Sequence, residues 1–208
     1  MQSNDNRRTG RGSARIRLLD AAIREIRTCG LHATTVDDLC STAGVTKGAF
    51  FHHFATKDAL AIEAARYWST TTGALFAAAP YHDLTDPADR VLAYLDLRAS
   101  LIHGQPADYT CLAGTMVQEA FDSIPLVREA CAESIFGHAE TLEADITAAL
   151  ANAGNEGVDA KSLARHTQAV LQGSFILAKA SDDEAVVLDS IAHLRRYLEL
   201  LFGVPTSV

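Results

Sequence analysis

The amino-acid sequence predicts an all-α protein, and two observations support this prediction. Apolar residues recur at spacings of three and four along nearly the whole chain, whereas no stretch of four or more residues alternates cleanly between apolar and polar side chains. Capping residues such as Thr and Asp precede these stretches, and Gly follows many of them. We therefore expect about nine helices and no sheet.

The first third of the chain is expected to hold four helices. In the first, Ile16, Leu19, Ile23 and Ile26 are spaced by three or four residues, and Gly30 supplies a left-handed stop. Each of the next three follows a threonine that can cap it. The expected ranges are 14–29, 36–43 after Thr34 or Thr35, Thr46 through Phe54, and a long helix from Lys57 past Trp68 after Thr56.

Five further helices are expected downstream. Asp86 followed by Pro87 is a cap with proline at the first helical position. Gly104, Gly154 and Gly203 follow three of the expected ends. The expected ranges are 87–103, 109–121, 125–153, 159–180 and 182–202.

Length and composition restrict the class of protein. With 208 residues, 48% of them apolar, the chain can form one domain or two unequal ones around a sizeable core, which excludes a large multidomain enzyme and a wholly disordered chain. The longest apolar run, Ala74–Ala79, is too short to cross a membrane, and no secretory signal is readable, so we expect a cytoplasmic protein. The four cysteines lack the spacing of a metal or disulfide motif, and we expect no metal and no cofactor.

The charges are segregated along the chain. Residues 1–57 carry nine basic and five acidic side chains, a net charge of +4, whereas the rest carries nine basic and 21 acidic ones, a net charge of −12. A small basic module joined to a larger acidic body is typical of a nucleic-acid reader. We expect a flexible basic arm at 1–13, either solvated or adding affinity for DNA, a DNA-binding domain at 14–57 and a helical body at 58–208.

The expected second and third helices follow the plan of a helix-turn-helix. A helix of about eight residues, a turn containing Gly44 and a second helix from Thr46 place the latter to enter the major groove by its N-terminal end. Residues 14–62 resemble the TetR family of transcriptional regulators. The resemblance is carried by Thr34-Thr35-Val36, Ala43 to Gly48, His53-Phe54 and Lys57 to Leu60. That resemblance implies a homodimer, a palindromic double-stranded DNA operator, and a small-molecule effector that binds the C-terminal body and releases the DNA.

Both physics and the resemblance indicate which residues contact DNA. Gly48 lets the backbone approach DNA closely, and Lys47 is placed for a phosphate or a guanine edge. Phe51 stands where the family commonly has tyrosine and can touch only a thymine methyl, while His52 is better suited to a polar base contact. Phe50 and Phe54 are expected in the core. His53 either packs inside the domain or contacts a phosphate, and Lys57 is expected to clamp a phosphate. The predicted DNA-binding residues are Thr35, Thr46, Lys47, Gly48, Phe51, His52, His53 and Lys57.

Two predictions concern the acidic body. The stripe of Val187, Ile191, Leu194, Leu198 and Leu201 either covers the protein's own core or forms a helix-helix seam, and the resemblance favours a dimer interface. The predicted effector pocket is lined by Trp68, Tyr94, His103, Cys111, Met116, Glu119, Phe136, Gln172 and Phe175, with Glu119 alternatively an edge residue that reaches water.

Three alternative functions stay open on the sequence. An enzyme could use His103, Glu119 and His138 as a metal or acid-base set, although no catalytic motif accompanies them, and we expect no enzyme. A constitutive DNA-binding protein would need no effector. A thiol sensor would act through Cys111, which is expected at the start of a helix, where the helix dipole favours thiolate.

Overall fold

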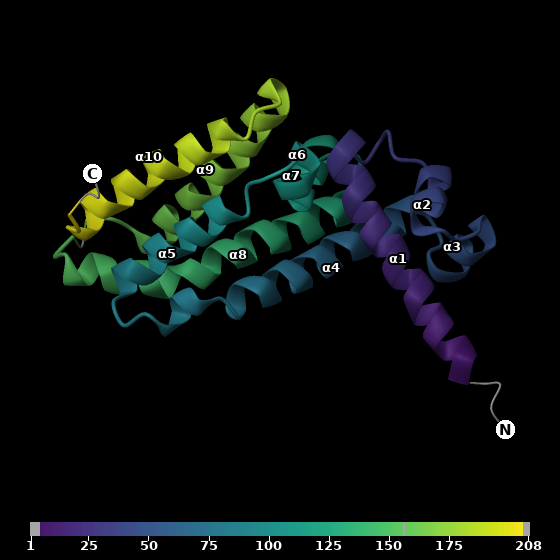
Figure 1. Ribbon diagram of the computed structural model, residues 1–208, viewed down its shortest axis with the longest axis horizontal. Coiled ribbons are helices and arrows are strands. Elements are labelled where there is room, and N and C mark those ends of the chain that lie inside the picture. Colours follow the sequence, from purple (N-terminus) through teal and green to yellow (C-terminus); the bar gives the residue numbers. More distant parts are fainter. Residues whose placement is uncertain (1–4, 156, 206–208) are drawn as a thin grey trace. The chain divides into compact units, whose positions relative to one another are not determined.

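The computed structural model describes residues 5–155 and 157–205, with side chains from residue 14 onward. In this part of the chain it contains ten α-helices, one 3-10 helix and no strand, which confirms the predicted all-α class (Figure 1). Among these helices, none has both the length and the apolar character needed to cross a membrane.

The chain folds into two compact units, each assembled from two stretches of sequence. Unit 1 consists of residues 1–71 and 112–134, and unit 2 of residues 72–111 and 135–208. The divisions fall inside α4 (Lys57–Ala77) and α8 (Pro125–Asn152). The sequence placed a boundary after residue 57, but the unit that holds the helix-turn-helix also takes in Leu112–Ser134, because apolar side chains of that stretch help to form its core.

Unit 1 is organised around α1 (Asp5–Cys29), which packs against α2 (Val36–Ala43), α3 (Lys47–His53) and α7 (Leu112–Ala120). As predicted, Phe50 and Phe54 are buried. A unit of this size needs such large side chains, because it can bury little apolar surface otherwise. Other buried side chains of unit 1 are Leu18, Leu19, Ile26, Leu31, Leu39, Leu60, Leu112 and Met116.

The start of α1 differs from the prediction. The helix begins at Asp5 and not at Ala14, so the part of the predicted flexible arm that the structure describes, residues 5–13, is helical. Arginine, which occurs three times in residues 5–13, has a high helix propensity. This propensity favours a helix although Gly10 and Gly12, which had suggested a flexible arm, are poor helix formers.

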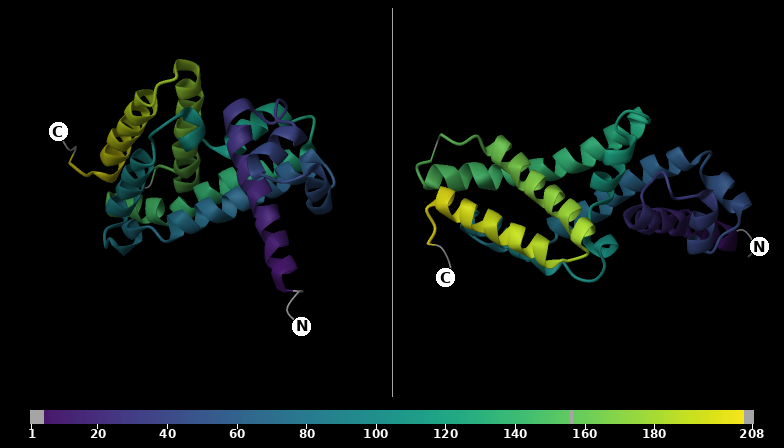
Figure 2. Two further views of the ribbon diagram at one scale, coloured as in Figure 1. Left: turned by 45° about the vertical axis from the view of Figure 1, so that its right-hand side comes forward. Right: turned by 90° about the horizontal axis from the view of Figure 1, so that it is seen from above.

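Unit 2 is a helical bundle in which α10 packs against α9 and α5. Figures 1 and 2 show α9 and α10 as neighbouring helices that lie closest where the chain turns from one into the other. Unit 2 includes the part of α4 from residue 72 and the part of α8 from residue 135. Its other elements are η1 (Pro80–Asp83), α5 (Pro87–Ser100), α6 (Pro106–Tyr109), α9 (Ala160–Ser181) and α10 (Ala185–Phe202).

The apolar stripe of α10 faces the inside of unit 2. Its first four residues, Val187, Ile191, Leu194 and Leu198, are buried against α5 and α9, and Leu201 is partly buried. The prediction that this stripe forms the dimer interface is therefore wrong. A core helix and an interface helix show the same spacing of apolar residues in the sequence, because a helix needs an apolar stripe whether its partner belongs to the same chain or to another.

Two other elements differ from their predicted ranges. The helix expected at 109–121 begins three residues later, as α7, because the chain is extended at Thr110, and the short helix α6, which was not predicted, precedes it. Helix α5 ends at Ser100, three residues before the predicted end at His103, which is exposed.

Candidate nucleic-acid interface

The turn between α2 and α3 has the geometry that its sequence predicts. Thr35 caps α2 by accepting a hydrogen bond from the backbone N–H of Asp38 at 3.2 Å, and the Asp38 carboxylate accepts the N–H of Thr35 at 3.0 Å. The Thr35 hydroxyl also donates to this carboxylate at 2.6 Å, and this bond, followed by the bond from the Thr35 N–H, lowers the pKa of Asp38. Gly44 ends α2 in the left-handed conformation, with φ of 61°, which glycine adopts without the cost that a side chain adds. Thr46 then caps α3 through the N–H of Ala49.

The N-terminal end of α3 is open to solvent. Thr46, Lys47, Gly48 and His52 are exposed, and the Phe51 ring is 57% exposed although it is large and apolar. A Cβ atom at Gly48 would come no closer than 3.7 Å to its neighbour, so packing within the unit does not require glycine there. An exposed surface with a glycine, a cation and an aromatic ring is what the predicted approach to DNA needs.

Lys47 is paired with an acid of the preceding helix. Its Nζ lies 2.7 Å from an Asp37 carboxylate oxygen, and both side chains are more than half exposed. The hydrogen bond to Asp37 raises the pKa of Lys47. The amine is therefore charged, but it has to exchange Asp37 for a phosphate if it contacts DNA.

Lys57 holds the loop between α1 and α2 in place. Its Nζ donates hydrogen bonds to the carbonyl oxygens of Leu31 at 2.9 Å, His32 at 3.3 Å and Thr34 at 2.9 Å. The side chain is half-buried at the start of α4. The ammonium thus has a structural role that the sequence did not indicate, and its predicted contact with a phosphate stays a prediction.

Glu119 binds the same loop from the other side. Its carboxylate accepts the backbone N–H of Leu31 at 3.2 Å and of His32 at 2.8 Å. Gly30 has φ of 91°, which favours glycine, and a Cβ atom there would also force the Glu119 carboxylate to shift. Each Glu119 oxygen accepts one backbone N–H of the loop, so Glu119 is not a free edge residue, and its predicted place in an effector pocket stays a prediction.

The nine residues predicted to line an effector pocket fall into both units. Trp68, Met116 and Glu119 belong to unit 1, where Met116 is fully buried and the Arg27 guanidinium lies 4.8 Å from the centre of the Trp68 ring. In unit 2, Phe136 is exposed beneath Arg165. The other members in unit 2 are Tyr94 and Phe175, both buried, Gln172 and Cys111, both partly buried, and the exposed His103.

A chain of polar groups crosses the interior of unit 2. The Gln168 amide donates to the Tyr94 hydroxyl at 3.1 Å, and this hydroxyl lies 3.0 Å from Nε2 of His138. Burial, together with the nearby charge of Arg98, lowers the pKa of His138 to about 4. The neutral imidazole therefore accepts the Tyr94 proton at Nε2 and carries its own proton at Nδ1.

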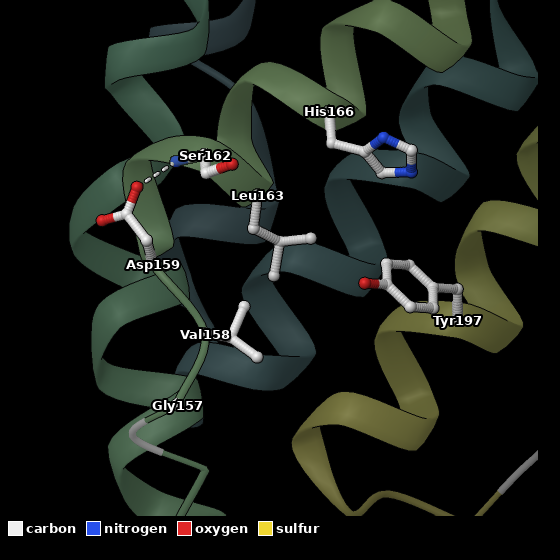
Figure 3. Close-up of a pocket in the computed structure, with 7 residues that line it drawn as sticks. All are labelled: Gly157, Val158, Asp159, Ser162, Leu163, His166 and Tyr197. Carbon is white, nitrogen blue, oxygen red and sulfur yellow. Dashed lines mark hydrogen bonds between the residues drawn. The ribbon is translucent and has the colours of Figure 1, made fainter.

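One hollow of about 410 Å³ lies in unit 2 where α9 begins (Figure 3). The His166 and Tyr197 rings meet edge to face there with their centres 5.8 Å apart, and Asp159 accepts the N–H of Ser162 at 2.8 Å as the cap of α9. The described residues that line it, shown in Figure 3, include none of the nine predicted for the effector pocket: Gly157, Val158, Asp159, Ser162, Leu163, His166 and Tyr197.

The residues of the alternative functions are spread over the two units. Glu119 belongs to unit 1, and His103 and His138 belong to unit 2. Within the described residues, no three His, Cys, Asp or Glu side chains are grouped so that they could hold a metal ion. Cys111 is partly exposed directly before α7, but Cys29 is the more exposed thiol, so thiol sensing through Cys111 stays a prediction.

Family comparisons cover most of the chain. Residues 18–64 match the model described as bacterial regulatory proteins of the tetR family, and residues 87–193 match the C-terminal domain of LmrA/YxaF-like transcriptional regulators. The second match alone spans half of the chain, and both describe a transcriptional regulator and not an enzyme.

Individual proteins agree with these matches. The chain is 26% identical to the uncharacterized HTH-type transcriptional regulator YxaF of Bacillus subtilis over 182 residues, which is 86% of this chain and 92% of YxaF. It is 38% identical to the HTH-type transcriptional repressor KstR2 of Rhodococcus jostii over 58 residues, only 28% of either chain. A TetR transcriptional regulator from Chloroflexus aurantiacus shares the fold with a TM-score of 0.78 and 24% identity over 91% of this chain and 96% of its own. This chain belongs to the TetR family of transcriptional regulators.

Proposed function

We propose that the protein is a repressor that binds a palindromic operator as a homodimer and leaves it when a small-molecule effector binds unit 2. The observation that carries this proposal is the solvent-exposed surface of α3, with Lys47 and Gly48 at its start and Phe51 and His52 in its last turn. One such helix reads one half-site, and a palindrome needs two copies about one turn of DNA, 34–36 Å, or a multiple of it apart. The likeness to KstR2 favours repression, and DNA as the target favours action in the cytoplasm.

A dimer requires a surface other than the buried stripe of α10. Four large apolar side chains point out of unit 2 on the last two helices: Ile176 and Leu177 on α9, and Leu188 and Leu200 on α10. Leu200 is 75% exposed, which is costly for a leucine that stays in water. Because α9 and α10 are side by side, these residues can meet their copies across a twofold axis.

Sedimentation tests the dimer. Leu177→Arg should convert the dimer into monomer, because two charges would face each other without partners in the interface. Leu84→Arg is the matched control, since Leu84 is a similarly exposed leucine after η1. A monomeric wild type that still protects a full palindrome, or equal sedimentation of the two variants, would contradict the proposed dimer.

Operator selection from random DNA, followed by binding measurements at several salt concentrations, tests whether α3 recognises DNA. Lys47→Ala should weaken binding and reduce the slope of log K against log salt by about 0.9 for each lost phosphate contact. His52→Ala should instead change which bases are preferred. Lys57→Ala should lower both affinity and the free energy of unfolding, since three loop carbonyls lose their donor. Normal binding by Lys47→Ala at every salt concentration would refute the assigned register of α3.

Effector release is tested on the same complex. Small molecules that stabilise the protein against heat are added to the operator complex, and the loss of DNA is followed by fluorescence anisotropy. If no stabilising molecule releases DNA, the protein acts as a constitutive DNA-binding protein.

A further inference from the structure

The interior of unit 2 contains a cation that lacks an anion. The Arg98 guanidinium, in the last turn of α5, has its Cζ atom 5.2 Å from the centre of the Phe76 ring and 5.9 Å from the centres of the Tyr94 and Phe175 rings. These three rings are buried, and Arg98 is partly buried. Within the described residues Arg98 forms no ion pair, although its guanidinium can donate five hydrogen bonds.

A second observation next to it is independent of the first. The Tyr109 ring lies 6.4 Å from the same Phe175 ring, and its hydroxyl is buried without a hydrogen-bond partner. The hydroxyl of the neighbouring Thr110, a residue with only 1% of its surface exposed, is also unpartnered. A buried hydroxyl without a partner is destabilising and uncommon in folded proteins, so these two hydroxyls call for a bound partner.

Of the polar groups in contact with these rings, Arg98 and His138 offer donors, whereas the acids Asp182, Asp183 and Glu184 act on Tyr109 through their charge. The neutral His138 presents its Nδ1–H, because Nε2 is used by Tyr94. Burial, and then the charges of Asp182, Asp183 and Glu184, raise the pKa of Tyr109, so its hydroxyl keeps its proton and can donate. Among the acids of this unit, Asp145 is already paired with Arg90 at 2.7 Å.

We propose that the effector is an organic carboxylate with an apolar body, whose charge is bound by Arg98 and whose oxygen accepts the Tyr109 hydroxyl, while the body lies against Phe76 and Phe175. This inference rests on the proposed effector site in unit 2 and names the class of its ligand. A cationic effector is excluded from this place by the guanidinium, and a neutral one would leave the charge of Arg98 unpaired in an aromatic surrounding.

Calorimetry with two acid-amide pairs of equal shape tests the proposal: 2-naphthoate with 2-naphthamide, and decanoate with decanamide. At least one acid should bind wild-type protein about 10- to 100-fold more tightly than its amide, the range expected for a charge-assisted hydrogen bond. Arg98→Gln should remove this preference, whereas Arg165→Gln should keep it. Arg165 is the matched control because it also covers an aromatic ring of unit 2, that of Phe136, at 5.4 Å.

Tyr109→Phe keeps the test valid if Arg98→Gln folds poorly. This change removes only the unpaired hydroxyl, so the free protein should be as stable as wild type or more stable, while the affinity for the acid falls several-fold. Absence of binding by both acids, equal affinity for acid and amide, or equal effects of Arg98→Gln and Arg165→Gln would overturn the proposal. Operator binding and release are measured separately by anisotropy, so failure of the regulatory function is distinguishable from failure of the carboxylate preference.

Discussion

Replacing Glu119 by Gln should loosen the loop between α1 and α2. The carboxylate accepts two backbone N–H groups, those of Leu31 and His32, at 3.2 and 2.8 Å. A glutamine retains one oxygen for one of them and turns an NH₂ donor toward the other. One hydrogen bond to a charged acceptor is lost and two donors face each other.

The magnitude follows from the exposure of the side chain. Hydrogen bonds to charged groups contribute about 1.5–3 kcal/mol each, and removal of one partner exposes the cost of the group left behind. The Glu119 side chain is 28% exposed, so water replaces part of the lost interaction. We expect the free energy of unfolding to fall by about 1–2 kcal/mol, which lowers Tm by about 2–8 °C in a protein of this size.

Urea denaturation followed by circular dichroism at pH 7 measures this loss. Glu129→Gln is the control, because Glu129 belongs to the same unit and is exposed on α8. It removes the same charge without touching the loop. A Glu119→Gln variant within about 0.3 kcal/mol of wild type, or an equal loss in Glu129→Gln, would refute the assigned role of the carboxylate.

Three further predictions concern other sites. Asp37→Asn should tighten operator binding, because Lys47 no longer exchanges a carboxylate for a phosphate; unchanged anisotropy titrations at low salt would contradict this. The pKa of His138 is lowered from 6.5 to about 4, so between these pH values the unfolded protein binds more protons at this residue than the folded protein does. The contribution of His138 to stability should therefore fall by about 2 kcal/mol from pH 7 to pH 5, and urea titrations of His138→Gln should lack that part of the decline. Thr35→Ala should cost about 1 kcal/mol by removing the cap of α2, whereas Thr35→Ser, with the hydroxyl retained, should restore most of it in the same assay.

Local signals in the sequence predicted the helices well. Capping by Thr35, Thr46 and Asp159, and the left-handed stop at Gly44, depend on residues within four positions of one another, so they can be read from neighbours. The start of the helix predicted at 109–121 was placed three residues too early because Thr110 gives no strong breaking signal.

Contacts between distant residues could not be read in this way. Glu119 lies 88 positions from Leu31, and Lys57 lies 26 positions from it, so nothing in their local patterns indicates a shared loop. Arg98 lies in the last turn of its helix, where a basic side chain ordinarily interacts with the helix dipole, so its place in the sequence predicts only that interaction. Its aromatic neighbours come from three separate elements and become apparent only in the folded unit.

The two-part composition of unit 1 has a consequence for synthesis on the ribosome. The DNA-reading helices are translated first, but Leu112 and Met116, which are fully buried, and the Glu119 carboxylate follow much later. Until those residues emerge, the nascent N-terminal region exposes apolar surface that they will cover. A protein shortened to its first 71 residues should therefore bind operator poorly. In a nascent chain, unit 1 should become able to bind DNA only after residue 134 has left the exit tunnel.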